Sequence, residues 1–216
     1  MVVRSTVSRR DVLGLGVAAG GLLLTPLLVQ AATSRTPAQI LGPFYPVDKP
    51  LDQDTDLTRI AGKSARAKGE LIEITGRVLD QAGRPISGAR MEIWQANSYG
   101  RYTHPADTNE APLDPNFEGY ALLTTDSEGR YRFKTIKPGA YPQERGGPLR
   151  PPHIHFDVAS RKCRLVTQLY FAGEPLNESD RVLGSARDPS MLITTLQRTD
   201  ASEPAIGRWD IVLDQG

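Results

Sequence analysis

Two of the three histidines in the chain form the motif His153-Ile154-His155, which is the sharpest chemical feature of the sequence. Residues i and i+2 of a β-strand point to the same side, so a strand through this motif would place both imidazole rings on one face. Two such rings can share a metal ion, whereas the plain alternative is a pair of hydrogen-bonded sheet histidines. Arg150-Pro151-Pro152 precedes the motif and restricts the backbone that enters the strand, which favours the metal-binding interpretation.

Two histidines leave a coordination sphere incomplete, and the sequence offers two sources of further ligands. Asp157 lies at the next i+2 position and would complete a two-histidine, one-carboxylate iron site of cupin-like type. Tyr102 and Tyr141 are the second source, because they lie in long connections between the expected strands. A phenol with an ordinary pKa near about 10 becomes a ligand only beside a strong Lewis acid such as ferric iron, which removes its proton. Otherwise each tyrosine packs as a common aromatic side chain.

Short apolar segments separated by turn residues must position these side chains. Strands are expected at 71–79, 90–96, 120–125, 130–136, 153–158, 164–171 and 209–213. Many short strands punctuated by Gly and Pro predict an all-β fold, an antiparallel β-sandwich with little helix. The connections 99–119 and 137–152 exceed the usual loop length of about 4–6 residues, and we expect these long loops to form the active site.

Two local expectations are more specific. Asp126-Ser127-Glu128-Gly129 separates the strands expected at 120–125 and 130–136, which predicts a β-hairpin with a type I or bulged turn. Residues 191–198 are the one segment with plausible helical content.

The composition is that of an ordinary globular chain. Of 216 residues, 39% are hydrophobic and 24% are charged, and 26 Lys and Arg balance 25 Asp and Glu. This balance argues against nucleic acid as a partner. The single cysteine, Cys163, rules out an intrachain disulfide and a cysteine-based zinc site, so any metal must use other ligands.

Residues 1–31 are predicted to be a signal peptide. Three arginines within the first ten residues precede an uncharged stretch, 12–34, rich in Leu, Val, Ala and Gly, and small residues at 29–32 supply a cleavage site. The segment Ser8-Arg9-Arg10-Asp11-Val12-Leu13 resembles a twin-arginine signal, the address of proteins that are exported already folded.

The signal divides the chain into three expected parts. An extended arm, 32–69, would follow the signal peptide, and a β-sandwich domain, 70–216, would follow the arm. We therefore expect an exported, periplasmic protein without stable membrane insertion. A retained signal would instead anchor it, since about 20 apolar residues can span a bilayer.

Longer runs of the sequence resemble the intradiol ring-cleavage dioxygenases, and within them the iron-bearing subunits of the protocatechuate 3,4-dioxygenase type. The similar runs lie at 42–46, 74–80, 83–89, 92–97, 100–102, 114–117, 135–139, 150–156 and 167–171. They cover nearly all of the chain after the signal, in family order.

The resemblance implies a non-haem Fe(III) with four protein ligands: Tyr102, Tyr141, His153 and His155. Water or hydroxide would be the fifth ligand. Tyr141 matches the tyrosinate that leaves when substrate binds, and Tyr102 matches the one that stays.

The resemblance also implies roles around the metal. Arg150 matches an arginine that stabilises negative charge on the activated ring, and Gln168 matches a second active-site residue. Trp94 matches a substrate-pocket residue, although it also fits a packed strand aromatic, and Tyr45 is a further pocket candidate. The related iron-bearing subunits commonly have Trp two residues after the labile tyrosine, where this chain has Gln143, so we expect a more open or more polar pocket wall.

The implied activity is insertion of both atoms of O2 into a protocatechuate-like catechol, which gives a cis,cis-muconate-type product. The family also implies a homo-oligomer, or a hetero-oligomer with a related subunit. Two alternatives stay open: a cupin-like metal oxygenase that uses Asp157, and a non-catalytic β-sandwich binding module.

Overall fold

A computed structural model of the chain describes residues 1, 33–49 and 54–214. Apart from Met1, the predicted signal peptide lies outside the described residues. All helices and strands of the described residues belong to the unit 31–216. No helix among the described residues has both the length and the apolar character needed to cross a membrane.

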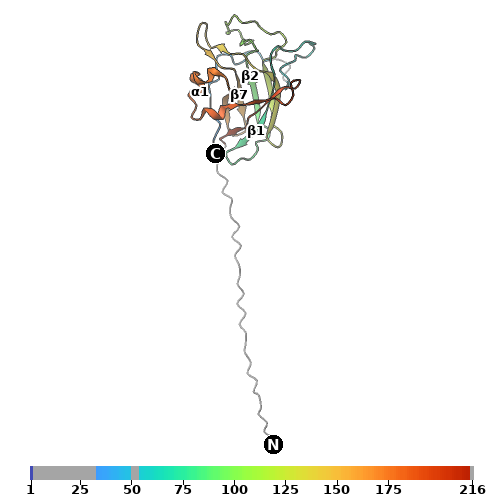
Figure 1. The fold of residues 1–216 in the computed structure, drawn as a ribbon, viewed down its shortest axis with the longest axis vertical. Coiled ribbons are helices and arrows are strands. Elements are labelled where there is room, and N and C mark those ends of the chain that lie inside the picture. The colour runs from blue at the N-terminus through green and yellow to red at the C-terminus, as the bar shows by residue number, and fades with distance from the viewer. Residues whose placement is uncertain (2–32, 50–53, 215–216) are drawn as a thin grey trace. The chain divides into compact units, whose positions relative to one another are not determined.

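Two five-stranded sheets carry the fold (Figure 1). The first has the order β10-β11-β1-β12, and β4 pairs with β1. Its strands are β1 (Leu71–Asp80), β4 (Arg130–Ile136), β10 (Leu196–Gln197), β11 (Ala205–Arg208) and β12 (Ile211–Leu213). The second has the order β3-β2-β7-β8-β9. Its strands are β2 (Arg90–Trp94), β3 (Tyr120–Thr124), β7 (His153–Ala159), β8 (Arg164–Phe171) and β9 (Ile193–Thr194).

The smaller elements lie in the connections of the sandwich. Strands β5 (Tyr141–Pro142) and β6 (Leu149–Arg150) form a two-stranded sheet. The helical elements are η1 (Pro175–Glu178), α1 (Arg181–Gly184) and η2 (Pro189–Leu192). The all-β prediction with little helix is confirmed.

The sheets are mixed rather than purely antiparallel. Strand β1 pairs in parallel with β11 and β12, and β8 pairs in parallel with β9. Parallel neighbours need a crossover connection of a dozen or more residues. The chain between β8 and β9 makes such a crossover through η1, α1 and η2, so β9 re-enters beside β8 without reversing direction.

The predicted hairpin at 120–136 is wrong. Strand β3 pairs with β2 and strand β4 pairs with β1, so the turn between them carries the chain from one sheet to the other. The turn still has local hydrogen bonds, from Gly129 N to Asp126 O and from Asp126 N to Arg130 O. Each strand buries a face against the opposite sheet, which an isolated hairpin could not do.

The helical prediction for 191–198 holds only for Met191 and Leu192, which end η2, and is wrong for the rest of the segment. The segment leaves η2 and continues as β9 and β10. Ile193, Thr194 and Thr195 are β-branched, and such side chains favour extended backbone. The α-helix of the described residues, α1, begins after Asp180, whose carboxylate accepts a hydrogen bond from Leu183 N.

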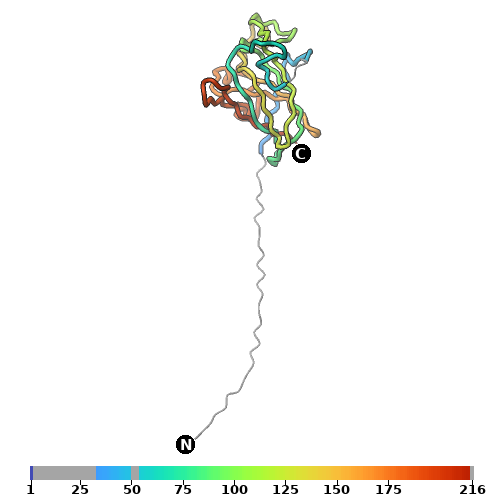
Figure 2. Tube along the Cα trace, turned by 90° about the vertical axis from the view of Figure 1, so that its right-hand side faces the viewer, coloured from blue at the N-terminus to red at the C-terminus, as the bar shows by residue number. Residues whose placement is uncertain are grey.

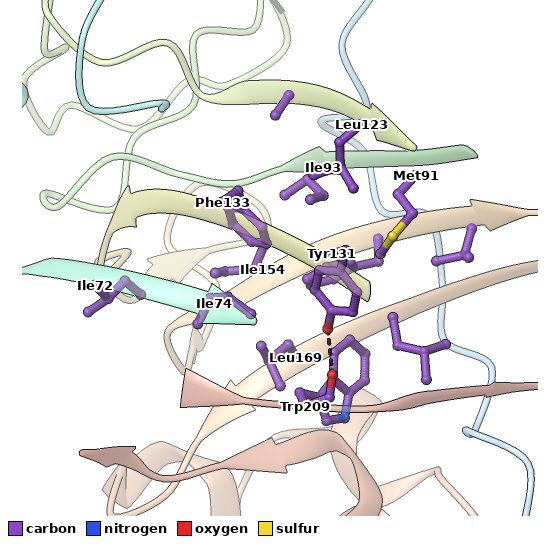
Figure 3. Packing of buried hydrophobic residues seen from close by; sticks show 14 of the residues in the cluster. Ile72, Ile74, Met91, Ile93, Leu123, Tyr131, Phe133, Ile154, Leu169 and Trp209 are labelled. Carbon is purple, nitrogen blue, oxygen red and sulfur yellow. Dashed lines mark hydrogen bonds between the residues drawn. The ribbon is translucent and has the colours of Figure 1, made fainter. Parts of the chain in front are cut away.

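The hydrophobic core lies between the two sheets (Figure 3). Ile74 on β1 and Phe133 on β4 belong to the same buried cluster as Ile93 on β2 and Ile154 on β7. Burying one such side chain contributes about 1.5–3 kcal/mol, so this cluster makes the sheets a rigid support for the loops.

Tyr131 and Trp209 hold the C-terminal strands to β4. The Tyr131 hydroxyl donates to the Trp209 carbonyl at 2.6 Å (Figure 3). Trp209 lies between β11 and β12, and its backbone N–H donates to Thr75 O at 2.9 Å. Its indole N–H donates to Met191 O at 2.8 Å.

Residues 33–49, the first described part of the arm, contain no helix or strand and are drawn in blue in Figure 2. Hydrogen bonds nevertheless tie it to the sandwich. Gln39 N donates to Val166 O at 2.8 Å, and Thr167 Oγ1 donates to Pro37 O at 2.8 Å.

We predict that Tyr131→Phe destabilises the protein by about 1–3 kcal/mol, because the Trp209 carbonyl loses a buried donor. Urea unfolding followed by circular dichroism measures the change. Tyr99→Phe, at a tyrosine that is 42% exposed, is the matched control and should leave the free energy of unfolding unchanged. Equal stability of the two variants would contradict the assigned role of this hydrogen bond.

Candidate metal centre

Three neighbouring strands bring the two histidines together. Strand β7 lies between β2 and β8, and His155 is opposite Trp94 on one side and Gln168 on the other. His153 is opposite Tyr170 on β8. The histidine rings project to the same side, as the i, i+2 spacing predicts, and their centroids lie 4.9 Å apart.

Loops bring two tyrosines to these histidines. Tyr141 lies on β5, and Tyr102 lies in the loop between β2 and β3. The Tyr102 and Tyr141 hydroxyl oxygens are 3.3 Å apart, and the Tyr141 oxygen is 3.1 Å from His153 Nε2. The Tyr102 ring contacts the His155 ring edge to face, with centroids 6.4 Å apart. All four candidate ligands therefore meet in one buried cluster.

The structure holds both histidines in the form that binds metals. His153 Nδ1 donates to Pro151 O at 2.7 Å, so the geometry assigns the ring proton to Nδ1 and the lone pair to Nε2. Burial and the charge of Arg150 lower the pKa of His153 well below its usual value. Burial, His153 and Arg150 lower the pKa of His155 in the same way.

The two phenols resist ionisation for the same reason. Burial raises the pKa of Tyr102 well above its ordinary value, and nearby Tyr141 adds to the effect. Burial also raises the pKa of Tyr141, although Arg150 opposes it. Two buried phenolates at this distance would repel each other, so only a multiply charged cation beside them would favour the doubly ionised form.

The donor set fits a hard, highly charged metal ion such as Fe(III). Two imidazoles and two phenols provide nitrogen and anionic oxygen ligands at one place. His155 Nδ1 is buried and has no hydrogen-bond partner among the described residues. A buried polar group without a partner costs about 1–3 kcal/mol, so hydrogen bonding at Nδ1 does not account for the burial of the His155 ring.

Asp157 does not join the cluster, although it lies on the same strand. Its two carboxylate oxygens accept hydrogen bonds from Arg164 at 2.8 and 2.7 Å. No three His, Cys, Asp or Glu side chains of the described residues lie close enough together to hold a metal ion. The cupin-like, carboxylate-containing site is therefore wrong, because Arg164 pairs with Asp157 further along β7.

Aromatic side chains and the arm cover the cluster. Trp94 stacks on His155 with centroids 4.8 Å apart and an interplanar angle of 11°. Phe44 of the arm lies 4.8 Å from the Tyr102 ring, again between centroids. Gly42 packs so closely that a Cβ there would lie 3.0 Å from His155 Cε1. This cover keeps water from the four candidate ligands.

Tyr45 also belongs to this cover, and its hydroxyl group is hydrogen-bonded to another side chain. Its ring meets the edge of Trp94 at 5.0 Å, and its hydroxyl donates to Glu92 at 2.6 Å. Burial alone would raise the pKa of Glu92, but its hydrogen bonds with Lys49 and Tyr45 lower that pKa to about 2. Tyr45 is thus part of an ionic cluster at the edge of the site.

Arg150 lies at the centre of a buried hydrogen-bond network beside the candidate ligands. Its Nη1 donates to His153 Nε2 at 3.0 Å. Its Nη2 donates to Gln168 Oε1 at 2.8 Å and to the Tyr170 hydroxyl at 2.7 Å, and its Nε donates to Asp180 Oδ2 at 2.8 Å.

Sequence reasoning did not identify Tyr170 or Asp180 as site residues. Tyr170 could have been found, because it lies two residues after Gln168 on an expected strand and so shares its face. No local pattern marks Asp180, which reaches the site only through the crossover after β8.

A groove borders the cluster at Tyr102. Its volume is about 350 Å³, and Val47, His104 and Leu113 also line it. That volume is at the lower end of the range of small-molecule sites, about 300–1,000 Å³. The groove is large enough for a single aromatic ring, and among the four candidate ligands Tyr102 alone lines it.

The two tyrosine-bearing loops pack backbone against backbone. Asn97 O accepts hydrogen bonds from Gly100 N at 3.0 Å and from Gly139 N at 2.9 Å. A Cβ on Gly139 would lie 2.5 Å from Gly100 N and 2.6 Å from Ser98 O, which leaves no room for any side chain. Tyr102 N donates to Asp107 Oδ2 at 2.7 Å and fixes the end of its loop.

Comparison with known proteins gives the class of this site. The family model described as "Dioxygenase" matches residues 40–215. The beta chain of protocatechuate 3,4-dioxygenase from Burkholderia cepacia is 44% identical over 179 residues, which cover 80% of this chain and 76% of that protein. Hydroxyquinol 1,2-dioxygenase from Rhizobium sp. is 31% identical over 202 residues, which cover 85% of this chain and 64% of that protein.

Solved structures agree in fold. The dioxygenase domain of a dioxygenase carbohydrate-binding protein fusion from Streptomyces sp. SirexAA-E has a TM-score of 0.65 and 29% identity, covering 85% of this chain and all of that one. The chain belongs to the intradiol ring-cleavage dioxygenases, a non-haem iron-dependent family that acts on catecholic compounds with O2.

We predict that Gly139→Ala lowers the iron affinity of the protein by about 10- to 100-fold, because a methyl group there forces the two tyrosine loops apart. Iron titration of the metal-free variant measures the affinity, and far-ultraviolet circular dichroism reports the fold. Gly184→Ala is the control, since nothing lies within 4 Å of the added Cβ. Unchanged iron affinity in Gly139→Ala would show that the packed loops do not set the site.

Proposed function

We propose that this chain cleaves a protocatechuate-like catechol between its two hydroxyl-bearing carbons, at a non-haem Fe(III) held by four side chains: Tyr102, Tyr141, His153 and His155. The observation that carries the proposal is the buried convergence of the two phenols and two imidazoles, with the 3.3 and 3.1 Å contacts at Tyr141. When bound, Fe(III) supplies a Lewis acid that ionises phenols and activates the catechol ring toward O2.

Tyr141 is the proposed ligand that leaves and takes a proton. The family resemblance supports this assignment, because Tyr141 matches the tyrosinate that leaves and Tyr102 matches the one that stays. As a phenolate, the Tyr141 oxygen would accept a proton from a catechol hydroxyl when the substrate displaces it. The hydroxide expected as the fifth ligand would accept the second catechol proton, so the site needs no separate strong base.

Arg150 is the proposed electrostatic partner of the substrate. Its guanidinium is buried beside His153, so its charge acts in surroundings with a low dielectric constant. A fixed positive charge there stabilises the negative charge that builds up on the ring during cleavage. Gln168 and Tyr170 orient it through their hydrogen bonds to Nη2.

The substrate assignment is supported by the 44% identity to a protocatechuate 3,4-dioxygenase beta chain. Trp94 and Phe44 would form the dry walls against the ring. Half-buried Gln143 would add a polar wall two residues after Tyr141. The relative's description as a beta chain also supports a working oligomer, either of this chain alone or with a related subunit.

We also propose that the protein is exported folded by the twin-arginine route and acts in the periplasm. Support comes from the sequence at 8–31, where Arg9 and Arg10 precede the uncharged stretch and small residues follow it. Folding before export would let the protein acquire its iron in the cytoplasm. Retention of the signal would leave the enzyme anchored at the membrane.

We predict that protein purified from an exporting host contains about one iron per chain and is wine-red from tyrosinate-to-iron charge transfer. Anaerobic titration with protocatechuate, catechol and hydroxyquinol should shift the band, and O2 uptake should be fastest with protocatechuate. A colourless protein without O2 uptake on any catechol would refute the proposed chemistry. Faster uptake with another catechol would refute the substrate assignment alone.

We predict that replacing both Arg9 and Arg10 with Lys blocks export and leaves the iron-loaded protein in the cytoplasm. Fractionation and immunoblotting measure the distribution. Arg4→Lys is the control and should leave export intact, because it lies outside the arginine pair. Export of the doubly substituted protein at the native level would argue against this route.

A further inference from the structure

Asp180 forms a buried ion pair with Arg150. Its Oδ2 accepts from Arg150 Nε at 2.8 Å, and its Oδ1 accepts from Arg150 Nη2 at 3.3 Å. The arginine side chain is 6% exposed and the aspartate side chain is 3% exposed. Such a two-point contact fixes both the position and the plane of a guanidinium.

The crossover after β8 places this carboxylate. Asp180 follows η1 and begins α1, and its Oδ1 also accepts from Leu183 N at 2.7 Å. The carboxylate therefore has two tasks, because one oxygen caps the helix and both oxygens contact Arg150. Loss of the carboxylate would remove both the helix cap and the contact with Arg150, so an experiment must separate these two roles.

The contacts of Arg150 are divided between its two sides. Asp180 binds Nε and Nη2, while Nη1 points to His153 Nε2 at 3.0 Å. Burial opposes the charged form of Arg150, but its hydrogen bond to Asp180, together with the nearby Tyr170, Tyr141 and Asp180 side chains, outweighs burial and raises its pKa. An arginine buried without this partner would tend to move toward water, away from the candidate ligands.

We propose that Asp180 is a positioning residue for ring cleavage, which acts through Arg150 by holding Nη1 toward the metal centre. This inference rests on the proposed function, because it assigns to Arg150 the stabilisation of charge on the ring. Asp180 itself needs no contact with substrate.

Asp180→Asn separates the charge from the cap, because Asn caps helices about as well as Asp. The variant keeps an oxygen for Leu183 N and loses the negative charge that faces Arg150. Asp188→Asn is the matched control. Asp188 is exposed, and its carboxylate accepts from Ser190 N at 3.1 Å at the start of η2.

The first measurement is steady-state kinetics with iron content and the visible spectrum as companions. We expect Asp180→Asn to lower kcat by about 10- to 100-fold, with iron content retained and the charge-transfer band preserved. Asp188→Asn should behave as the native protein. In an Arg150→Gln background, Asp180→Asn should cause no further loss of kcat, because its effect passes through the arginine.

The second measurement is urea unfolding of the metal-free protein, which is independent of turnover. Asp180→Asn should lower the folding equilibrium constant by about 100-fold or more, because it leaves a buried charge without its partner. The double variant with Arg150→Gln should recover most of that loss. If Asp180→Asn does not fold alone, recovery of folding in the double variant is the supporting result and failure to recover contradicts the proposal.

An equal fall in kcat in both backgrounds, or native kcat in Asp180→Asn, would overturn the inference. Failure of the proposed function looks different, because the native protein would then oxidise no catechol. In that case, urea unfolding of the single and double variants would still measure the interaction between Asp180 and Arg150. A native enzyme that cleaves a catechol, with an Asp180→Asn variant equally active, would refute the positioning role alone.

Discussion

Two phenols and two imidazoles share one buried site, and this arrangement is the constraint on which the remaining structure depends. Burial raises the pKa of both tyrosines and lowers the pKa of both histidines, so the surroundings disfavour every charged form of the cluster. The positive charge of Arg150, which lies beside the cluster, is balanced by the negative charge of Asp180. A trivalent cation reverses this balance, because it makes ionised phenols and neutral imidazoles the favoured states together.

The fold divides the work between rigid and adjustable elements. The central strand β7 fixes both histidines, and its neighbours β2 and β8 add Trp94 and Gln168 in register. The tyrosines come from loops, which can place a side chain where a sheet cannot. Packing of Gly100 against the Tyr141 loop keeps those loops from moving independently. The arm then closes the cluster with Phe44.

The sequence predicts the features that depend on local chemistry and misses those that depend on tertiary pairing. The common face of His153 and His155 follows from the two-residue period of a strand. The choice between Asp157 and the tyrosines does not, because it depends on Arg164 across the sheet. Likewise the turn before Arg130 has local hydrogen bonds, yet the strands that it joins belong to different sheets. The role of Asp180 could not be predicted, because Asp180 reaches Arg150 only through the fold of the connection between β8 and β9.

The most direct test of this account is crystallographic diffraction from the purified protein at the iron absorption edge. The account predicts one strong anomalous peak within bonding distance of the Tyr102 and Tyr141 oxygens and of a ring nitrogen from each of His153 and His155. A peak bound by the Asp157 carboxylate, or one that lies away from either tyrosine, would contradict it.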